Sequence, residues 1–312
     1  MLQKRKLNVV AILTLAVIAG LAVLMAVPVT AVAGTLQLNE GAGIGARALA
    51  MGGAFVAVAD DASGGFWNPA GLEGLDKRWA SYSGLINNRD QKPGVDDFIV
   101  YAEPDNGFAS GAVSALRESH KDPVSGLTTS KSLYSYSLAL KAPATGLSFG
   151  GSLKYITESQ ETTPGQLTSG TAFSVDVGGM LRLTPGFAFG VMAQDLVRPT
   201  VRFSDPAAQP RSYPLVVNAG AAWRPDDKTV FAVDAHDLTK AGPVGMTVHV
   251  GVERWLTPII ALRAGAQAGI AGAGWQGITA GTALRYTDWQ LDYAFLARDL
   301  GDTSVMTLSY RF

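Results

Sequence analysis

Apolar and polar side chains alternate along most of this chain, from residue 78 to residue 312. The alternation runs in segments of about ten residues that are separated by clusters of Gly, Pro, Asp, Asn and Thr. A period of two is typical of β-strands, because successive side chains of an extended chain point to opposite faces. In segment 171–184, Phe173 and Val175 fall on an apolar face, whereas Ser174 and Asp176 fall on a mixed face. The pattern predicts an all-β chain.

The connections between these segments alternate in length. Tight turns are expected at Pro104–Gly107, Ala142–Gly146, Thr184–Gly186, Pro225–Lys228, Thr257–Pro258 and Thr287–Asp288. Longer loops are expected at Asn87–Asp96, Ser119–Ser130, Ser159–Gly170, Arg198–Arg211, Thr239–Gly245, Ile270–Gly277 and Asp299–Thr303. Short turns on one side and longer loops on the other are typical of outer-membrane barrels. The sequence therefore predicts a transmembrane antiparallel β-barrel of about 14 strands, although about 12 strands also fit the length.

Composition and charge agree with a location in the cell envelope. Charged residues make up 16% of the chain, below the roughly 25% of soluble domains. The formal net charge of −1 leaves no electrostatic basis for binding nucleic acid. The absence of Cys excludes zinc thiolate sites, iron–sulfur clusters and thiol catalysis, and we expect no cofactor. The expected partners are outer-membrane lipid and either hydrophobic small molecules or an exported protein, and we expect a monomer.

Residues 1–33 resemble a secretory signal peptide. Lys4, Arg5 and Lys6 precede an apolar run, and Ala31-Val32-Ala33 offers a cleavage site of small residues. An uncleaved membrane anchor is the alternative, because the apolar run is long. We expect three regions: a signal peptide at 1–33, an N-terminal plug segment at 34–77 and the barrel at 78–312.

Residues 34–77 lack the strand period. Gly, Ala and Val dominate the first part, and Asp60-Asp61 and a turn-forming Asn68-Pro69 follow. A 14-stranded barrel is too wide for its own side chains to fill, so its lumen has room for such a segment. We therefore interpret 34–77 as a plug.

This segment carries a resemblance to a known family. The sequence GARALAMGGAFVAVADDA at 45–62, followed by WNPAGL at 67–72, resembles the N-terminal region of the PorV/PorQ family within the FadL-like outer-membrane barrel superfamily. The plug motif residues are Arg47, Gly52, Gly53, Asp60, Asp61, Asn68, Pro69 and Gly71. The resemblance implies a 14-stranded barrel with its N-terminal segment inside. It also implies one of two functions, passage of hydrophobic molecules such as long-chain fatty acids or non-enzymatic assistance to protein secretion. The chain is shorter than FadL, which leaves little room for FadL's long loops.

Charged residues on the predicted inner face suggest how the plug is held. Near the tight turns we expect a lumen basic belt of Lys141, Arg182, Arg224, Arg263, Arg285 and Arg311. The predicted lumen acids are Asp176, Asp234, Glu253 and Asp292. We expect Asp60 and Asp61 to anchor the plug to the belt, because buried charges need partners. The alternative is that the arginines only solvate a wet lumen or extend to the periplasmic lipid headgroups.

Two further groups of residues have alternative interpretations. His236 shares a predicted strand face with Asp234, and His249 shares one with Glu253, which would suit a barrel hydrolase, but no Ser stands out as a nucleophile. Aromatic residues near the tight turns are expected in the membrane interface: Trp79, Trp223, Trp255, Tyr286, Trp289 and Tyr310. The sequence thus predicts a non-enzymatic outer-membrane channel for small hydrophobic solutes, with a PorV-like secretion scaffold as the alternative.

Overall fold

The computed structural model describes residues 44–88, 95–121, 125–143, 145–241, 245–270, 275–297 and 302–312. The predicted signal peptide and residues 34–43 of the predicted plug lie outside the described residues.

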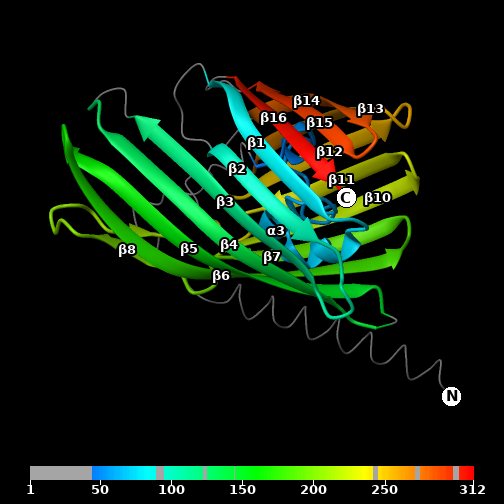
Figure 1. Ribbon diagram of the computed structural model, residues 1–312, viewed down its shortest axis with the longest axis horizontal. Helices are drawn as coiled ribbons and strands as arrows, with labels where there is room; N and C mark the ends of the chain where they lie inside the picture. The colour runs from blue at the N-terminus through cyan, green and yellow to red at the C-terminus, as the bar shows by residue number, and fades with distance from the viewer. Residues whose placement is uncertain are drawn as a thin grey trace.

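The strands form one closed antiparallel sheet around a lumen (Figure 1). Fourteen strands of the described chain make the ring: β1 (Trp79–Asn88), β2 (Val95–Glu103), β3 (Ser110–Lys121), β4 (Thr128–Lys141), β5 (Leu147–Thr163), β6 (Gln166–Thr184), β7 (Phe187–Gln194), β10 (Val216–Asp226), β11 (Thr229–His236), β12 (Thr247–Trp255), β13 (Ile260–Gly269), β14 (Trp275–Tyr286), β15 (Trp289–Ala297) and β16 (Thr303–Arg311). Pairing of β1 with β16 and of β5 with β6 closes the ring. The predicted 14-stranded β-barrel is confirmed.

Alternation assigns each side chain to the lumen or to the outside. On β6, Asp176 and Met180 are buried on the inner face, whereas Phe173 and Leu183 are more than half exposed on the outer face. The six predicted tight turns lie together at one end of the barrel, which we call the short-turn end. The opposite end, the long-loop end, faces the cell exterior by the usual arrangement of such barrels.

Two of the predicted long loops are wrong. The segment 159–170 is a hairpin, because β5 continues to Thr163 and β6 begins at Gln166. The segment 119–130 also shortens, since β3 reaches Lys121 and β4 begins at Thr128. Both segments are rich in polar residues, as loops are. In the structure β3 and β4 pair as far as Lys121 and Thr128, and β5 and β6 pair as far as Thr163 and Gln166 with one irregularity at Glu161. Strands with two wet faces are expected where a wall rises above the membrane.

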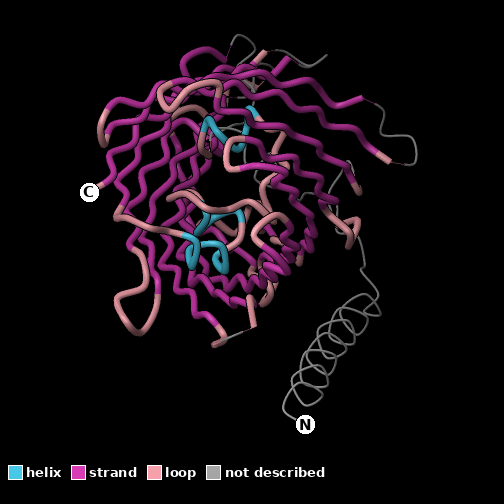
Figure 2. The backbone as a smooth tube through the Cα atoms, turned by 90° about the vertical axis from the view of Figure 1, so that its right-hand side faces the viewer, coloured by secondary structure: helices cyan, strands magenta, loops and turns pink. Residues whose placement is uncertain are grey.

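The helices of the described chain lie inside the ring of strands (Figure 2). They are α2 (Ala46–Ala50), α3 (Gly64–Trp67) and the 3-10 helix η1 (Pro69–Gly74). In the part of the chain that the structure describes, no helix has the length and apolarity required to cross a bilayer.

Candidate functional site

The N-terminal residues 44–77, which we call the inner segment, are held against the barrel wall by hydrogen bonds. The backbone N–H groups of Phe55 and Val56 donate to the carboxylate of Asp234, at 2.6 and 2.8 Å. The Ala46 N–H donates to Thr307 Oγ1 at 2.8 Å. Because this backbone is largely irregular, its buried polar groups need partners from outside the segment. The wall supplies them.

Small residues allow the inner segment to lie directly on the wall. Gly52 has a φ of +68°, which a residue with a side chain rarely adopts. A Cβ on the wall residues Gly251 or Gly265 would lie less than 3.0 Å from backbone atoms of Met51 or Gly52. Gly53 also has a positive φ and lies against the His249 ring. The two backbones therefore touch with no side chain between them.

Asn68, Pro69 and Gly71 shape the last turn of the inner segment. Asn68 Nδ2 donates to the Val56 carbonyl at 2.9 Å and to the Gly179 carbonyl of β6 at 3.2 Å. Its Oδ1 accepts from the Ala70 N–H and so caps η1, in which Pro69 holds the first position. A Cβ on Gly71 would collide with the Ala59 carbonyl oxygen. This motif thus joins two turns of the inner segment to each other and to the wall.

Arg47 is the centre of an ionic network. Its Nη1 lies 2.6 Å from Asp60 Oδ1 and 3.2 Å from Asp61 Oδ2, and its Nε lies 2.8 Å from Glu253 Oε2. Arg263, on the neighbouring strand, contacts the same Glu253 oxygen at 2.6 Å. Nη1 of this Arg263 also lies 2.7 Å from Asp292 Oδ1. The network connects the inner segment to three strands of the wall.

The pKa values of the two adjacent aspartates shift in opposite directions. Burial alone would raise the pKa of Asp60, but the Arg47 and Arg224 guanidiniums outweigh it and hold this pKa below its ordinary value. Arg224 Nη2 lies 2.9 Å from Asp60 Oδ2. Burial raises the pKa of Asp61, because Arg47 and Ser63 offset it only in part. Asp61 Oδ1 accepts from the Ser63 Oγ–H and N–H at 2.6 and 2.9 Å.

The structure corrects the expected contacts between these aspartates and the basic belt. Asp60 contacts Arg224, but Asp61 contacts no belt residue and turns back toward Arg47 and Ser63. Lys141 has the parity of the inner face of β4, with Ser137 and Ala139, but it is exposed at the end of the strand. Arg182 faces inward beside Gly74 of η1.

The remaining two belt residues pair with aromatic rings. The Arg285 guanidinium lies 4.0 Å from the centre of the Trp255 ring, and that of Arg311 lies 5.2 Å from the Trp79 ring. Trp79 is buried, and the alternation along β12 places Trp255 on the inner face. The prediction that both lie in the interfacial girdle is therefore wrong. A tryptophan on the inner face provides a cation–π partner for a lumen arginine.

Both histidine–acid pairs serve the inner segment. His249 Nδ1 lies 2.6 Å from the Gly52 carbonyl oxygen, and its Nε2 lies 2.8 Å from Thr247 Oγ1. The His236 and His249 rings stack with centroids 4.0 Å apart. Asp234, 3.4 Å from His236, already accepts the two backbone N–H groups described above. Glu253 pairs with arginines and not with His249. Both histidine–acid pairs therefore hold the backbone or the side chains of the inner segment in place.

An apolar row crosses the wall toward the long-loop end. Five inward side chains are cross-strand neighbours from β2 to β6: Phe98, Leu116, Leu133, Ile156 and Ala172. The first four are at most 3% exposed. The next inward row toward the long-loop end contains Glu118, Lys131 and Glu158. The next inward row toward the short-turn end contains Ser114, Ser135 and Lys154. The apolar row is therefore a distinct band between polar layers.

The connection from β7 to β10, residues 195–215, covers this row, and we call it the strap. It contains β8 (Thr200–Phe203) and β9 (Arg211–Ser212), and β8 pairs with the upper part of β6. Val201 and Tyr213 of the strap are buried against the apolar row. Figure 1 shows β8 beside the long strands at the far side of the barrel from β13.

Charged contacts fasten the strap to the wall. Lys154 Nζ lies 2.7 Å from Asp176 Oδ1 and 2.6 Å from Asp195 Oδ1, which joins the strap's first residue to β5 and β6. Arg211 Nη1 lies 3.1 Å from Glu158 Oε2, and the Tyr213 hydroxyl donates to the same carboxylate. The sequence-based prediction included neither Lys154 nor Glu158. Both lie on the inner face of β5, and this alternation was the available signal.

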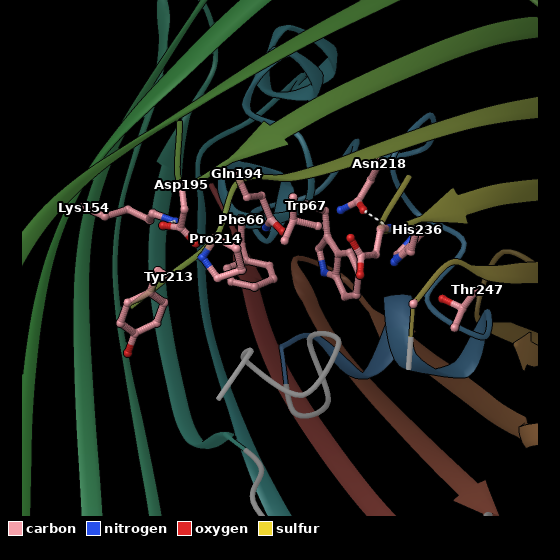
Figure 3. A pocket seen from close by; sticks show the side chains of 13 residues that line it. Phe66, Trp67, Lys154, Gln194, Asp195, Tyr213, Pro214, Asn218, His236 and Thr247 are labelled. Atoms are coloured by element: carbon pink, nitrogen blue, oxygen red, sulfur yellow. Dashed lines mark hydrogen bonds and ion pairs between the residues drawn. The ribbon is translucent and has the colours of Figure 1, made fainter. Parts of the chain in front are cut away.

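A cavity of about 70 Å³ lies between α3 and the strap. Phe66 and Trp67 form one side of it, and Gln194, Asn218 and His236 project from the wall on the other (Figure 3). In the described part of the chain, no group of three or more His, Cys, Asp or Glu residues is arranged to hold a metal ion.

The outer surface is apolar. Leu153, Tyr134 and Phe173 are each more than half exposed on the outer face, as are many of their neighbours. Near the short-turn end Trp223 stacks between Phe187 and Phe231, with ring centroids 6.1 and 5.4 Å away. Trp223, Tyr286 and Trp289 are exposed, as expected of an interfacial girdle. Such a surface is stable in hydrocarbon and not in water.

No protein-family model and no curated protein matches the chain. Solved structures do. The toluene transporter TbuX of Ralstonia pickettii superposes with a TM-score of 0.67 at 13% identity, over 88% of this chain and 100% of that chain. The toluene transporter TodX of Pseudomonas putida gives 0.62 at 13% identity, over 88% and 99%. A Pseudomonas aeruginosa FadL homologue gives 0.56 at 13% identity, over 90% and 99%.

The fold is FadL-like. Together with the apolar outer surface, this fold is that of a membrane-spanning β-barrel, as the sequence predicted. The likeness reaches the fold alone, so membership of the FadL-like superfamily and of the PorV/PorQ family stays a prediction.

Proposed function

We propose that the chain is a passive, monomeric outer-membrane channel for small hydrophobic solutes, without a cofactor or a catalytic step, and that residues 34–77 serve as its plug. The observation that carries this proposal is the apolar row of Phe98, Leu116, Leu133, Ile156 and Ala172 inside the lumen. Water-filled barrels line the lumen with polar residues. A band of apolar side chains inside the lumen instead suits a hydrophobic solute.

The names of the similar structures point the same way. Two of them are called toluene transporters and another a monoaromatic hydrocarbon channel, CymD, with a TM-score of 0.63 at 12% identity over 88% of this chain and 99% of that chain. Histidine–acid pairs that are occupied by the inner segment also favour transport over catalysis.

The test is uptake of labelled toluene and labelled oleate by Gram-negative cells that lack their own hydrocarbon and fatty-acid channels. A lipopolysaccharide outer membrane is the right barrier, because pure phospholipid passes toluene unaided. Cells expressing the chain should take up at least one probe faster than cells with the empty vector. Leu133→Asn should reduce this gain, and Ser135→Ala, one row away on the same strand, should not. Equal uptake in both cells, with folded barrel present, would refute the channel.

A second candidate is a PorV-like scaffold that assists protein secretion. It is favoured by the resemblance of 45–72 to that family and by the close contact between the inner segment and the wall. Deleting the gene should then abolish export of a partner protein without changing hydrocarbon uptake. Leu133→Asn should leave that export intact.

A further inference from the structure

The cavity between α3 and the strap has two chemically different sides. Phe66 and Trp67 meet edge to face at 5.7 Å and present ring surface to the cavity. The indole N–H of Trp67 is already bound to the Ile44 carbonyl at 3.1 Å, so this side offers apolar contact only. A flat ring is the natural complement to such a surface.

The opposite side offers unused hydrogen-bond donors. Asn218 Oδ1 accepts from the Asp237 N–H at 2.9 Å, which fixes the amide and leaves Nδ2 facing the cavity. Within the described ranges, neither Asn218 Nδ2 nor the Gln194 amide has a protein partner, and neither is sealed from the cavity. Figure 3 shows both side chains directed toward the space beside Trp67. A ligand oxygen there would satisfy donors that are otherwise left to water.

The lining of the cavity does not favour anions. Lys154 Nζ is already shared between Asp176 and Asp195 at 2.7 and 2.6 Å. Asp237 Oδ1 accepts from the Thr239 Oγ–H and the Ala241 N–H at 2.9 Å. A carboxylate ligand would therefore have to compete with Asp176 and Asp195 for Lys154.

The volume limits the size of the ligand. A dry engineered cavity of about 150 Å³ accepts benzene, whereas this one has about 70 Å³. A single ring would therefore have to displace part of the lining, and a long alkyl chain would have to displace more of it.

We propose that this cavity is a selectivity site for neutral single-ring aromatic solutes that carry one hydrogen-bonding oxygen, phenol being the simplest. The ring lies on Phe66 and Trp67, and the oxygen accepts from Gln194 and Asn218. This site rests on the proposed channel function and specifies which solutes that channel selects.

The test is equilibrium dialysis of labelled phenol, toluene and benzoate against the full chain in lipid nanodiscs, with empty nanodiscs subtracted. Phenol should bind about 10-fold tighter than toluene, as one net hydrogen bond provides, and benzoate should not bind. Gln194→Met keeps the side-chain size and removes the amide. It should weaken the affinity for phenol about 5- to 10-fold and change the affinity for toluene less than about 2-fold. Gln166→Met, at the exposed β5–β6 tip, is the matched control and should change neither.

Phe66→Leu completes the test, because removing the ring should weaken the binding of phenol and of toluene to a similar extent. Equal affinity of the wild-type chain for phenol and toluene, or equal loss of both in Gln194→Met, would overturn the proposal, and so would saturable benzoate binding. The outcomes separate this site from the channel. Selective binding without any cellular uptake would refute the channel and keep the site, whereas uptake without phenol preference would refute the site alone.

Discussion

Two segments fill the lumen, the inner segment and the strap, and the wall holds them in different ways. The inner segment lies backbone to backbone on Gly251 and Gly265, in the middle of β12 and β13, and Arg47 ties it to Glu253. The strap pairs with β6 at Gly170 and Thr171, and the ion pairs of Lys154 and Glu158 fasten it further. A side-chain ion pair can be released by a rotamer change, whereas a buried backbone contact cannot. We therefore expect the inner segment to unfold with the barrel and the strap to open locally at a lower cost.

The strongest way to break this contrast is Arg47→Met. It would leave Glu253, Asp60 and Asp61 without their shared partner in a buried site, at a cost of about 3–5 kcal/mol in unfolding free energy. Urea titration followed by the gel shift of folded barrel measures this. Arg78→Met removes an exposed pair with Glu103 and should cost less than about 1 kcal/mol. Similar losses in both variants would contradict a central role for Arg47.

Gly251→Val tests the backbone contact itself. The new side chain would meet the Met51 carbonyl, and the overpacking should cost about 1–3 kcal/mol in the same titration. Gly111→Val places the same change on β3, where the nearest atoms lie 3.6 Å from the new Cβ. The two substitutions should differ clearly. If they do not, the inner segment has more freedom than its packing implies.

Glu158→Gln should loosen the strap and leave the inner segment unchanged. It weakens the contacts to Arg211 and Tyr213, so amide hydrogen exchange in 196–213 should accelerate about tenfold. Exchange in 44–77 should stay the same. Asp226→Asn, an exposed acid at the opposite end, is the control and should alter neither segment. Faster exchange in both segments would mean that the two segments unfold as one unit.

The smallest expected effect is a pH-dependent difference in stability between variants of the two adjacent aspartates, Asp60 and Asp61. The lowered pKa of Asp60 contributes stability that is present above its ordinary value of 3.8 and is lost as pH falls below that value. The raised pKa of Asp61 has the opposite sign, so its charge costs stability above its folded pKa. At pH 7, Asp60→Asn should therefore cost more than Asp61→Asn, by about 1 kcal/mol or less. The gap should close as the pH falls below 3.8, and a constant gap from pH 7 to pH 3 would contradict it.

The barrel could be predicted because lipid imposes one rule on every strand. An outer face in hydrocarbon must be apolar, so the alternation reveals the faces and the turn lengths reveal the ends. The rule does not apply above the membrane, which is why the β5–β6 hairpin resembled a loop in the sequence. It is also weak at the rim, where Trp79 and Trp255 could face either way.

The contacts inside the lumen were only partly predictable. Charge type and strand parity predicted that Arg224, Arg263 and the lumen acids face inward. Which cation meets which anion depends on the path of the inner segment, whose irregular backbone has no sequence period. Arg47 was therefore identified as a motif residue and not as the centre of the network.

The rim of the barrel is slanted and not level. β5 and β6 have 17 and 19 residues, whereas β7 and β11 have 8 each. At a rise of about 3.3 Å per residue, the tall wall stands roughly 30 Å further along the strand direction than the low one. The long-loop end is thus bounded by tall strands on one side and by short strands on the other, and the strap spans the step between β7 and β6.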